Sequence, residues 1–149
     1  MNERRIAREF FSELVGARER VSMAWERLAK AQDYIGIHPA NMSGTGAVHG
    51  VSDPTSRLAI RIAECDADLR KAEAAYRLAM TRTRTLLANM PDSREKTVLV
   101  SHYVDGMPLY RICGKLDRCE ATVYAVHRNA LDEAGRIIQK IFQNYTKPY

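Results

Sequence analysis

Apolar residues recur at alternating spacings of three and four over residues 3–32. This spacing gives an α-helix one continuous apolar side, since it follows the helical period over many turns. Arginine and glutamate fill much of the other faces. The apolar seam consists of Ala7, Phe10, Leu14, Ala17, Val21, Ala24, Leu28 and Ala31, and it is widened by Ile6, Phe11 and Trp25. The pattern predicts a first segment, residues 1–32, formed by one long amphipathic helix.

The pattern breaks over residues 33–53, where four glycines and a proline stand among small polar residues. Neither the helical nor the strand period is present, so we expect a flexible linker. The linker contains two histidines, His38 and His49. No cysteine or acidic residue accompanies them at the spacing of metal ligands, and solvated loop histidines are therefore the better interpretation.

A second long helix is predicted over residues 54–90. Asp53 is a good N-cap, and Pro54 suits the first helical position because its missing N–H has no partner there. Its seam consists of Leu58, Ile62, Cys65, Leu69, Ala72, Tyr76, Ala79, Thr83, Leu86 and Met90. An apolar seam of this length must be buried against another apolar surface. We expect it to meet the first seam in an antiparallel hairpin, with association of two chains as the alternative.

Three shorter helices are expected in the last segment, residues 91–149. Pro91 stops the preceding helix, and Asp92 with Glu95 resembles a capping box at the start of the next one. Gly106 is expected to end that helix. A short helix then starts at Pro108, and a longer one starts near Cys119.

The last two helices have the residue sizes that a helix-turn-helix requires. Such helices cross steeply over a turn of three or four residues, so a small residue is needed at the crossing. Cys113 is expected to be buried there, flanked by Ile112, Leu116, Val123 and Val126. The sequence therefore predicts an all-α fold, in which a long helical hairpin or coiled coil is followed by a C-terminal helix-turn-helix domain.

Charge and composition narrow the function classes. The formal net charge of +5 is compatible with a nucleic-acid partner, although the basic residues are spread along the chain. No apolar run approaches the length of a membrane span or of a signal-peptide core, so we expect a cytoplasmic protein without a membrane partner. Three cysteines without paired spacing predict reduced thiols.

Residues 86–133 contain a pattern that is typical of a known family of helical proteins. A helix ends in Tyr-x-x-Gly, a short helix follows, and the next helix contains Thr-Val-Tyr-x-x-His-x-x-Ala-Leu. These residues are Tyr103, Gly106, Thr122, Val123, Tyr124, His127, Ala130 and Leu131. The stretch resembles region 4 of bacterial sigma factors. More narrowly, it resembles phage-encoded sigma-factor-region-4-like proteins, among them late transcription regulators of the ArpU and RinA types.

The resemblance implies a sequence-specific DNA-binding transcription regulator of phage or prophage type that acts at promoters. Double-stranded DNA is the expected partner, and RNA polymerase is a second one. The side chains expected to read bases are Glu120, Ala121, Thr122, Tyr124, Ala125 and Arg128. Those expected to contact phosphates are Arg111, Lys115 and Arg118.

The turn before the last helix departs from the family pattern. Asp117 stands where glycine is usual, Arg118 where an apolar residue is usual, and Cys119 where serine would cap the helix. Aspartate adopts left-handed geometry more easily than most residues, so we expect the turn to form around Asp117. Cysteine is a poor N-cap, and its use costs about 1 kcal/mol.

The sequence gives little indication of metal binding or catalysis. Cys113, Cys119 and His127 could be interpreted as zinc ligands, but the helix crossing explains Cys113 better, and His127 matches a packing or surface position of the family pattern. Ser101, His102 and Asp105 point in different directions from one helix, which argues against a catalytic triad. We therefore predict no enzyme and no cofactor. The alternative functions are a DNA-packaging component similar to a small terminase subunit, and a helical interaction module that has lost DNA binding.

Overall fold

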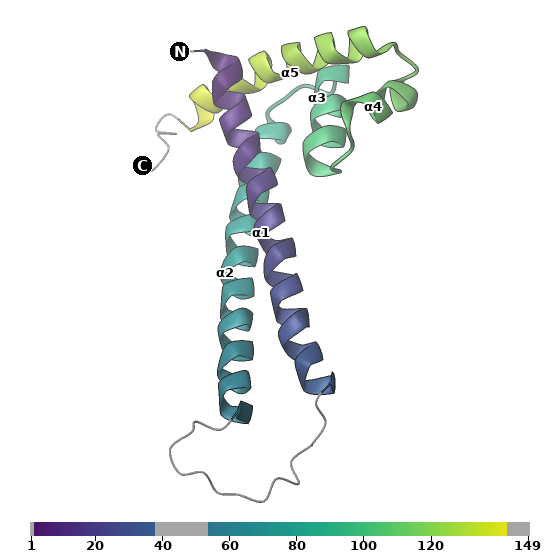
Figure 1. The fold of residues 1–149 in the computed structure, drawn as a ribbon. Helices are drawn as coiled ribbons and strands as arrows, with labels where there is room; N and C mark the ends of the chain where they lie inside the picture. The colour runs from purple at the N-terminus through teal and green to yellow at the C-terminus, as the bar shows by residue number, and fades with distance from the viewer. Residues whose placement is uncertain (1, 38–53, 143–149) are drawn as a thin grey trace, which may run out of the picture. The chain divides into compact units, whose positions relative to one another are not determined.

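The computed structural model describes residues 2–37 and 54–142, and within these ranges every regular element is a helix (Figure 1). The prediction of an all-α protein is confirmed for this part of the chain. The elements are α1 (Glu3–Ile37), α2 (Pro54–Ala88), α3 (Arg94–Leu99), the π-helical turn η1 (Val100–Val104), α4 (Leu109–Leu116) and α5 (Glu120–Ile141).

The helices form two compact units. One unit is the contiguous segment Ala17–Arg77. The other combines Met1–Gly16 with Leu78–Tyr149, so it joins the start of α1 to the end of α2 and to the three shorter helices. Both long helices therefore contribute residues to both units.

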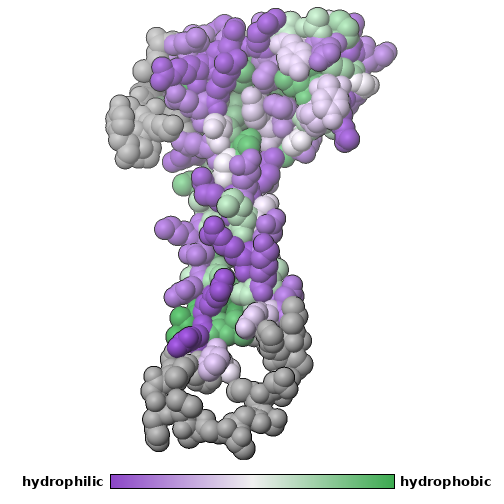
Figure 2. Space-filling model, viewed as in Figure 1, coloured by the Kyte–Doolittle hydropathy of each residue, from purple (hydrophilic) through white to green (hydrophobic). Residues whose placement is uncertain are grey.

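The contiguous unit is a helical hairpin held by the two predicted seams. Ala24 and Leu28 of α1 are buried together with Leu69 of α2. Half-buried Val21, Ile62, Cys65 and Ala72 pack around them. The prediction that the two seams meet is confirmed, and they meet within one chain. Figure 2 shows mostly hydrophilic side chains on the visible face of this hairpin.

Two expectations about α1 need correction. The helix continues to Ile37, five residues beyond the predicted boundary at 32. Gly36 lies within the helix, so the first glycine of the predicted linker does not end it. Trp25 does not widen the buried seam, because its side chain is 52% exposed. The rest of the predicted linker, with His38 and His49, lies outside the described residues, as does the predicted cap Asp53.

The second unit has a larger core, centred on the start of α1. Phe11 is fully buried and stacks on Tyr103 with ring centroids 4.2 Å apart. Phe10 contacts Phe11 edge-on and also contacts Phe142. The other buried members of this core are Ala7, Leu86, Leu87, Met90, Leu99, Ala130, Leu131, Ala134 and Ile138. This core positions α5 against the first turns of α1.

The connection between α2 and α3 differs from the predicted one in two details. The helix α2 ends at Ala88 rather than at residue 90, because the N–H of Met90 bonds the Leu87 carbonyl in a turn before Pro91. The N-cap of α3 is Ser93, not Asp92. The Ser93 hydroxyl accepts from the Lys96 N–H at 3.4 Å, while the Asp92 carboxylate pairs with the Lys96 ammonium at 3.0 Å.

A π-helical turn that the sequence pattern did not predict follows α3. The Asp105 N–H bonds the Val100 carbonyl at 2.9 Å, which spans five residues instead of four. Gly106 then ends the segment with a φ of 71°, the left-handed geometry that glycine adopts without strain. Gly106 thus ends the helical segment where it was predicted to.

Candidate nucleic-acid interface

The short helix α4 is bounded by two residues with non-helical backbone geometry. Pro108 occupies the N-cap position in an extended conformation. At the other end Asp117 is left-handed, with a φ of 50°, and the Arg118 N–H bonds the Cys113 carbonyl at 3.1 Å. This pattern closes a helix C-terminus and usually places glycine at the left-handed position. The prediction that Asp117 would accept this geometry is confirmed.

Cys119 is the N-cap of α5, and its side chain makes no capping hydrogen bond to the backbone. Its sulfur instead lies 3.0 Å from the Thr122 hydroxyl. This hydrogen bond, together with nearby backbone groups, lowers the pKa of the exposed Cys119 thiol. The structure therefore agrees with the expectation that Cys119 is a poor cap, although α5 begins at the next residue, Glu120.

A small hydrophobic core holds α4 and α5 together. Val98, Ile112, Val123 and Val126 are buried in it. Met107, Leu109, Cys113 and Leu116 pack around this core and are half-buried. The central position belongs to Ile112 rather than to Cys113, whose sulfur lies 3.4 Å from the Leu109 carbonyl. The expectation that Cys113 is buried at the crossing is therefore met only in part.

The residues expected to read bases lie on one face of the first turns of α5. Glu120, Ala121, Tyr124 and Arg128 are exposed, while Thr122 and Ala125 are half-buried. The alternation follows from the core below, because Val123 and Val126 take the inward positions. The described structure therefore presents an outward face with a phenol, a guanidinium and a carboxylate, from Tyr124, Arg128 and Glu120.

The three residues expected to contact phosphates differ in their surroundings. Arg111 and Arg118 are exposed, one at each end of α4. The Lys115 ammonium donates a hydrogen bond at 3.0 Å to the Ser101 hydroxyl, which is 1% exposed. Lys115 thus tethers α4 to η1, a role that sequence spacing did not indicate. The π-turn brings Ser101 into reach of it.

Aromatic and histidine side chains connect α5 to η1 and α1. The Tyr103 hydroxyl lies 3.1 Å from His127 Nε2, and Tyr103 stacks on Phe11. His102 Nδ1 lies 2.8 Å from the Met107 carbonyl. Burial, followed by the positive charges of His102 and Arg8, lowers the pKa of His127 to about 4. Burial raises the pKa of Tyr103. Tyr103 and His127, which both belong to the sequence pattern described above, therefore contact each other.

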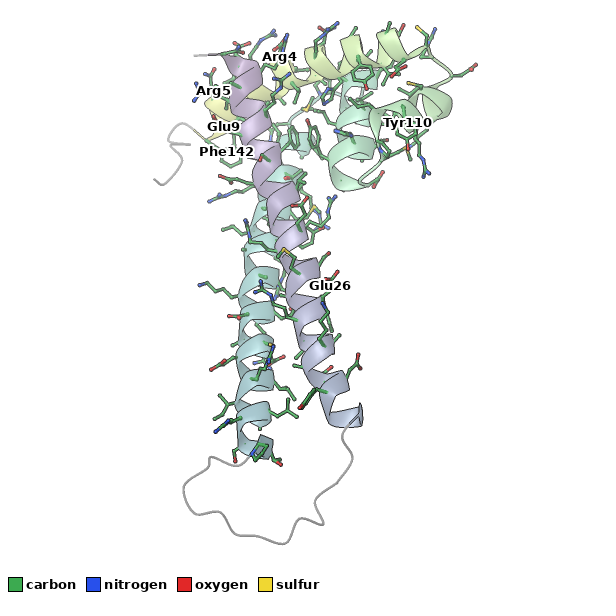
Figure 3. The ribbon with its side chains drawn as sticks, viewed as in Figure 1. Arg4, Arg5, Glu9, Glu26, Tyr110 and Phe142 are labelled. Atoms are coloured by element: carbon green, nitrogen blue, oxygen red, sulfur yellow. The ribbon has the colours of Figure 1, made fainter. Side chains whose placement is uncertain are left out.

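The position of α5 is also fixed by the first turn of α1, labelled at Arg4 in Figure 3. A Cβ on Gly135 would overlap the backbone carbonyl of Glu3, so the two helices approach as closely as glycine permits. Arg4 donates to both carboxylate oxygens of Asp132, at 2.9 and 2.6 Å, and this lowers the pKa of Asp132. Arg136 pairs with Glu3 at 3.0 Å.

Sequence reasoning missed this junction. A glycine inside the helical pattern of residues 120–141 was the available signal, because glycine is unfavourable in a helix interior unless packing requires it.

Two grooves lie among the described residues. A groove of about 270 Å³ is lined by Glu95, Asn129, Asp132, Glu133 and Arg136, of which two are already in ion pairs with α1. In the other unit a groove of about 370 Å³ is lined by Lys30, Ala31, Tyr34, Pro54, Arg57, Leu58 and Arg61. Among residues 2–37 and 54–142, no three metal-binding side chains gather at one point.

The helices α1, α2, α3, α4 and α5 all carry charged side chains along their length. None of them has the apolar length needed to cross a bilayer. Comparison of the chain with protein-family models, curated proteins and solved structures gives no match.

Proposed function

We propose that the chain is a sequence-specific DNA-binding transcription regulator of phage or prophage type, with α4 and α5 as its helix-turn-helix. One observation carries the proposal. The first turns of α5 hold an exposed face over a small core, and the exposed cations Arg111 and Arg118 flank it. A helix presented in this way can enter a major groove while flanking cations contact the phosphates.

The roles follow from what each side chain can do. Arg128 and Tyr124 can donate hydrogen bonds to base edges, and Glu120 can accept one from cytosine. Ala121, Thr122 and Ala125 offer small apolar or hydroxyl contacts to the groove floor. Arg111 and Arg118 carry the sequence-independent attraction to phosphates. Lys115 is exposed as well, and its ammonium can contact a phosphate while one of its N–H groups bonds Ser101.

The long hairpin supplies surface for protein partners in this proposal. RNA polymerase at the promoter, or a second copy of the chain, would dock there. Several large hydrophobic side chains of α1 and α2 are more than half exposed, namely Met23, Trp25, Tyr34, Ile60 and Leu78. These side chains are the apolar contacts that the hairpin would offer such a partner.

The test starts by selecting fragments of the host genome that the purified chain binds. Tyr124→Ala and Arg128→Ala should weaken binding to a selected site by about ten- to a hundredfold, because each removes a base contact. Arg111→Ala should weaken binding to all duplexes alike and reduce the salt slope by about one unit. Arg20→Ala is the matched control, since Arg20 is an exposed arginine of the hairpin.

The outcomes discriminate between the functions. A folded chain that binds no duplex in a salt-dependent way refutes the proposal and leaves the interaction module. DNA binding by a ring-shaped oligomer instead favours the packaging component.

A further inference from the structure

The hairpin has a groove between its two helices, near the end of α1 and the start of α2. It measures about 370 Å³ and lies wholly within the unit Ala17–Arg77. Two residues of the predicted seams form its floor, since Ala31 is buried and Leu58 is half-buried. Pro54 and Tyr34 add apolar surface beside the floor, and the Tyr34 side chain is 55% exposed. The groove can therefore receive an apolar side chain next to an aromatic ring.

The charged side chains that line this groove are all cationic. They are Lys30 of α1 and Arg57 and Arg61 of α2. Lys30 and Arg61 are exposed, and neither forms an ion pair within the described part of the chain. Acidic side chains occur further along both helices, but none of the described ones lines the groove. An anionic group in the groove would therefore meet positive charge that no lining carboxylate neutralises.

We infer that this groove between α1 and α2 binds an acidic segment of a protein partner, which inserts an apolar side chain between its carboxylates. The carboxylates pair with Lys30 and Arg61 on the two sides of the groove. The apolar side chain lies on Ala31 and Leu58 and against the ring of Tyr34. The inference deepens the proposed function, on which the partner's role rests, since the partner is the protein that the regulator contacts at the promoter.

A single strand of nucleic acid is the competing occupant, because its phosphates would also be attracted by the three cations. Proteins that bind single strands stack successive bases on several aromatic rings. Among the described lining residues Tyr34 is the one aromatic side chain. Phosphates also gain nothing from the apolar floor. A segment with both carboxylates and an apolar side chain uses the cations and the floor together, and it is therefore the better fit.

The experiment selects short random peptides that bind the full-length protein and measures their affinity by fluorescence anisotropy. We expect the selected peptides to be rich in aspartate and glutamate around a leucine or an aromatic residue. Arg61→Glu and Lys30→Glu should each weaken their binding by about three- to tenfold, because an attraction becomes a repulsion. Tyr34→Ser should weaken it by about three- to tenfold through the loss of apolar contact. Added salt should weaken binding of the unchanged protein, since the charged contacts are exposed.

Arg20→Glu is the matched control, because it makes the same charge change at an exposed arginine of the hairpin that does not line the groove. Arg111→Glu separates the groove from the basic surface of α4. Selected peptides without acidic residues would overturn the inference. So would acidic peptides whose affinity falls with Arg111→Glu but not with Arg61→Glu. A single-stranded oligonucleotide that displaces the peptides and loses affinity with Arg61→Glu would assign the groove to nucleic acid instead.

DNA binding is measured on the same variants, so that the two proposals can fail separately. The groove variants should bind a selected duplex as tightly as the unchanged protein does. If no peptide depends on the groove while Tyr124→Ala and Arg128→Ala still weaken duplex binding, the inference is wrong and the proposed function stands. If acidic peptides depend on the groove and no duplex binds, the groove is a protein docking site and the proposed function is wrong.

Discussion

At the scale of single residues, the turn between α4 and α5 shows what sequence reasoning can reach. Asp117 was predicted to take left-handed geometry because the turn requires it and aspartate tolerates it. The capping of α3 was assigned one residue too early, to Asp92 instead of Ser93. Both side chains can cap a helix, and their order in the sequence does not determine where the first helical turn closes.

Asp117→Gly should stabilise the protein by about 1 kcal/mol. Glycine has no Cβ to strain the left-handed position, and the change removes a negative charge from the carbonyl end of α4. The free energy of unfolding in urea measures the effect. Asp117→Asn separates the two causes, since it removes the charge and keeps a side chain. A loss of stability in Asp117→Gly would show that the carboxylate makes a contact that matters more than the strain.

At the scale of elements, the heptad period predicted both long helices and the residues that they bury. It could not predict the junction between α1 and α5, because periodicity shows which side of a helix is buried but not which helix covers it. The π-turn η1 was missed for a similar reason. Its single extra residue leaves the apolar pattern of the segment nearly unchanged, while it brings Ser101 into reach of Lys115.

Gly135→Ala should destabilise the protein by about 1–3 kcal/mol, since the added methyl group forces the backbone of α1 away from α5. The ion pairs of Arg4 with Asp132 and of Glu3 with Arg136 would lengthen with it. Urea unfolding measures the total effect, and amide hydrogen exchange in the first turns of α1 locates it. Gly114→Ala is the matched control of opposite sign, because a Cβ at Gly114 of α4 would have no heavy atom within 4 Å and alanine favours the helix. Equal stability changes in the two alanine variants would contradict the close approach at Gly135.

At the scale of the whole molecule, the all-helical class and the pairing of the two seams could be predicted from the sequence. The division into a contiguous hairpin and a unit built from both parts of the chain could not. Phe10 and Phe11 belong to the same seam as Leu28, yet they are buried in a different core. The candidate interface was predictable as a surface, whereas the support given to it by Lys115, Tyr103 and His127 depends on tertiary contacts.

The stability of the protein should fall as pH decreases from about 6.5 towards 4. His127 is held neutral in the folded state, with a pKa of about 4, while the unfolded chain takes up the proton near pH 6.5. The unfolded state therefore binds more protons in this interval and is favoured as pH falls. From the pKa change, the free energy of unfolding is lower near pH 4 than at neutral pH by at most about 3 kcal/mol. Solvent screening of this half-buried ring reduces the difference.

Urea unfolding at several pH values tests this, with His127→Gln as the comparison. Glutamine retains a polar group beside Tyr103 but does not titrate. We expect the stability of the variant to depend less on pH between 6.5 and 4. Parallel curves for the two proteins would show that His127 is not the group responsible.

The union of Met1–Gly16 with Leu78–Tyr149 in one unit has a consequence for how the chain is made. Phe11 leaves the ribosome about 120 residues before Leu131, which belongs to the same core. At about 5–20 residues per second, Leu131 is made roughly 6–24 s after Phe11. The contiguous segment Ala17–Arg77 can form its hairpin during that interval. The apolar side chains of Phe10 and Phe11 are therefore exposed on the nascent chain for a time. A chaperone or a neighbouring copy can bind them before α5 emerges.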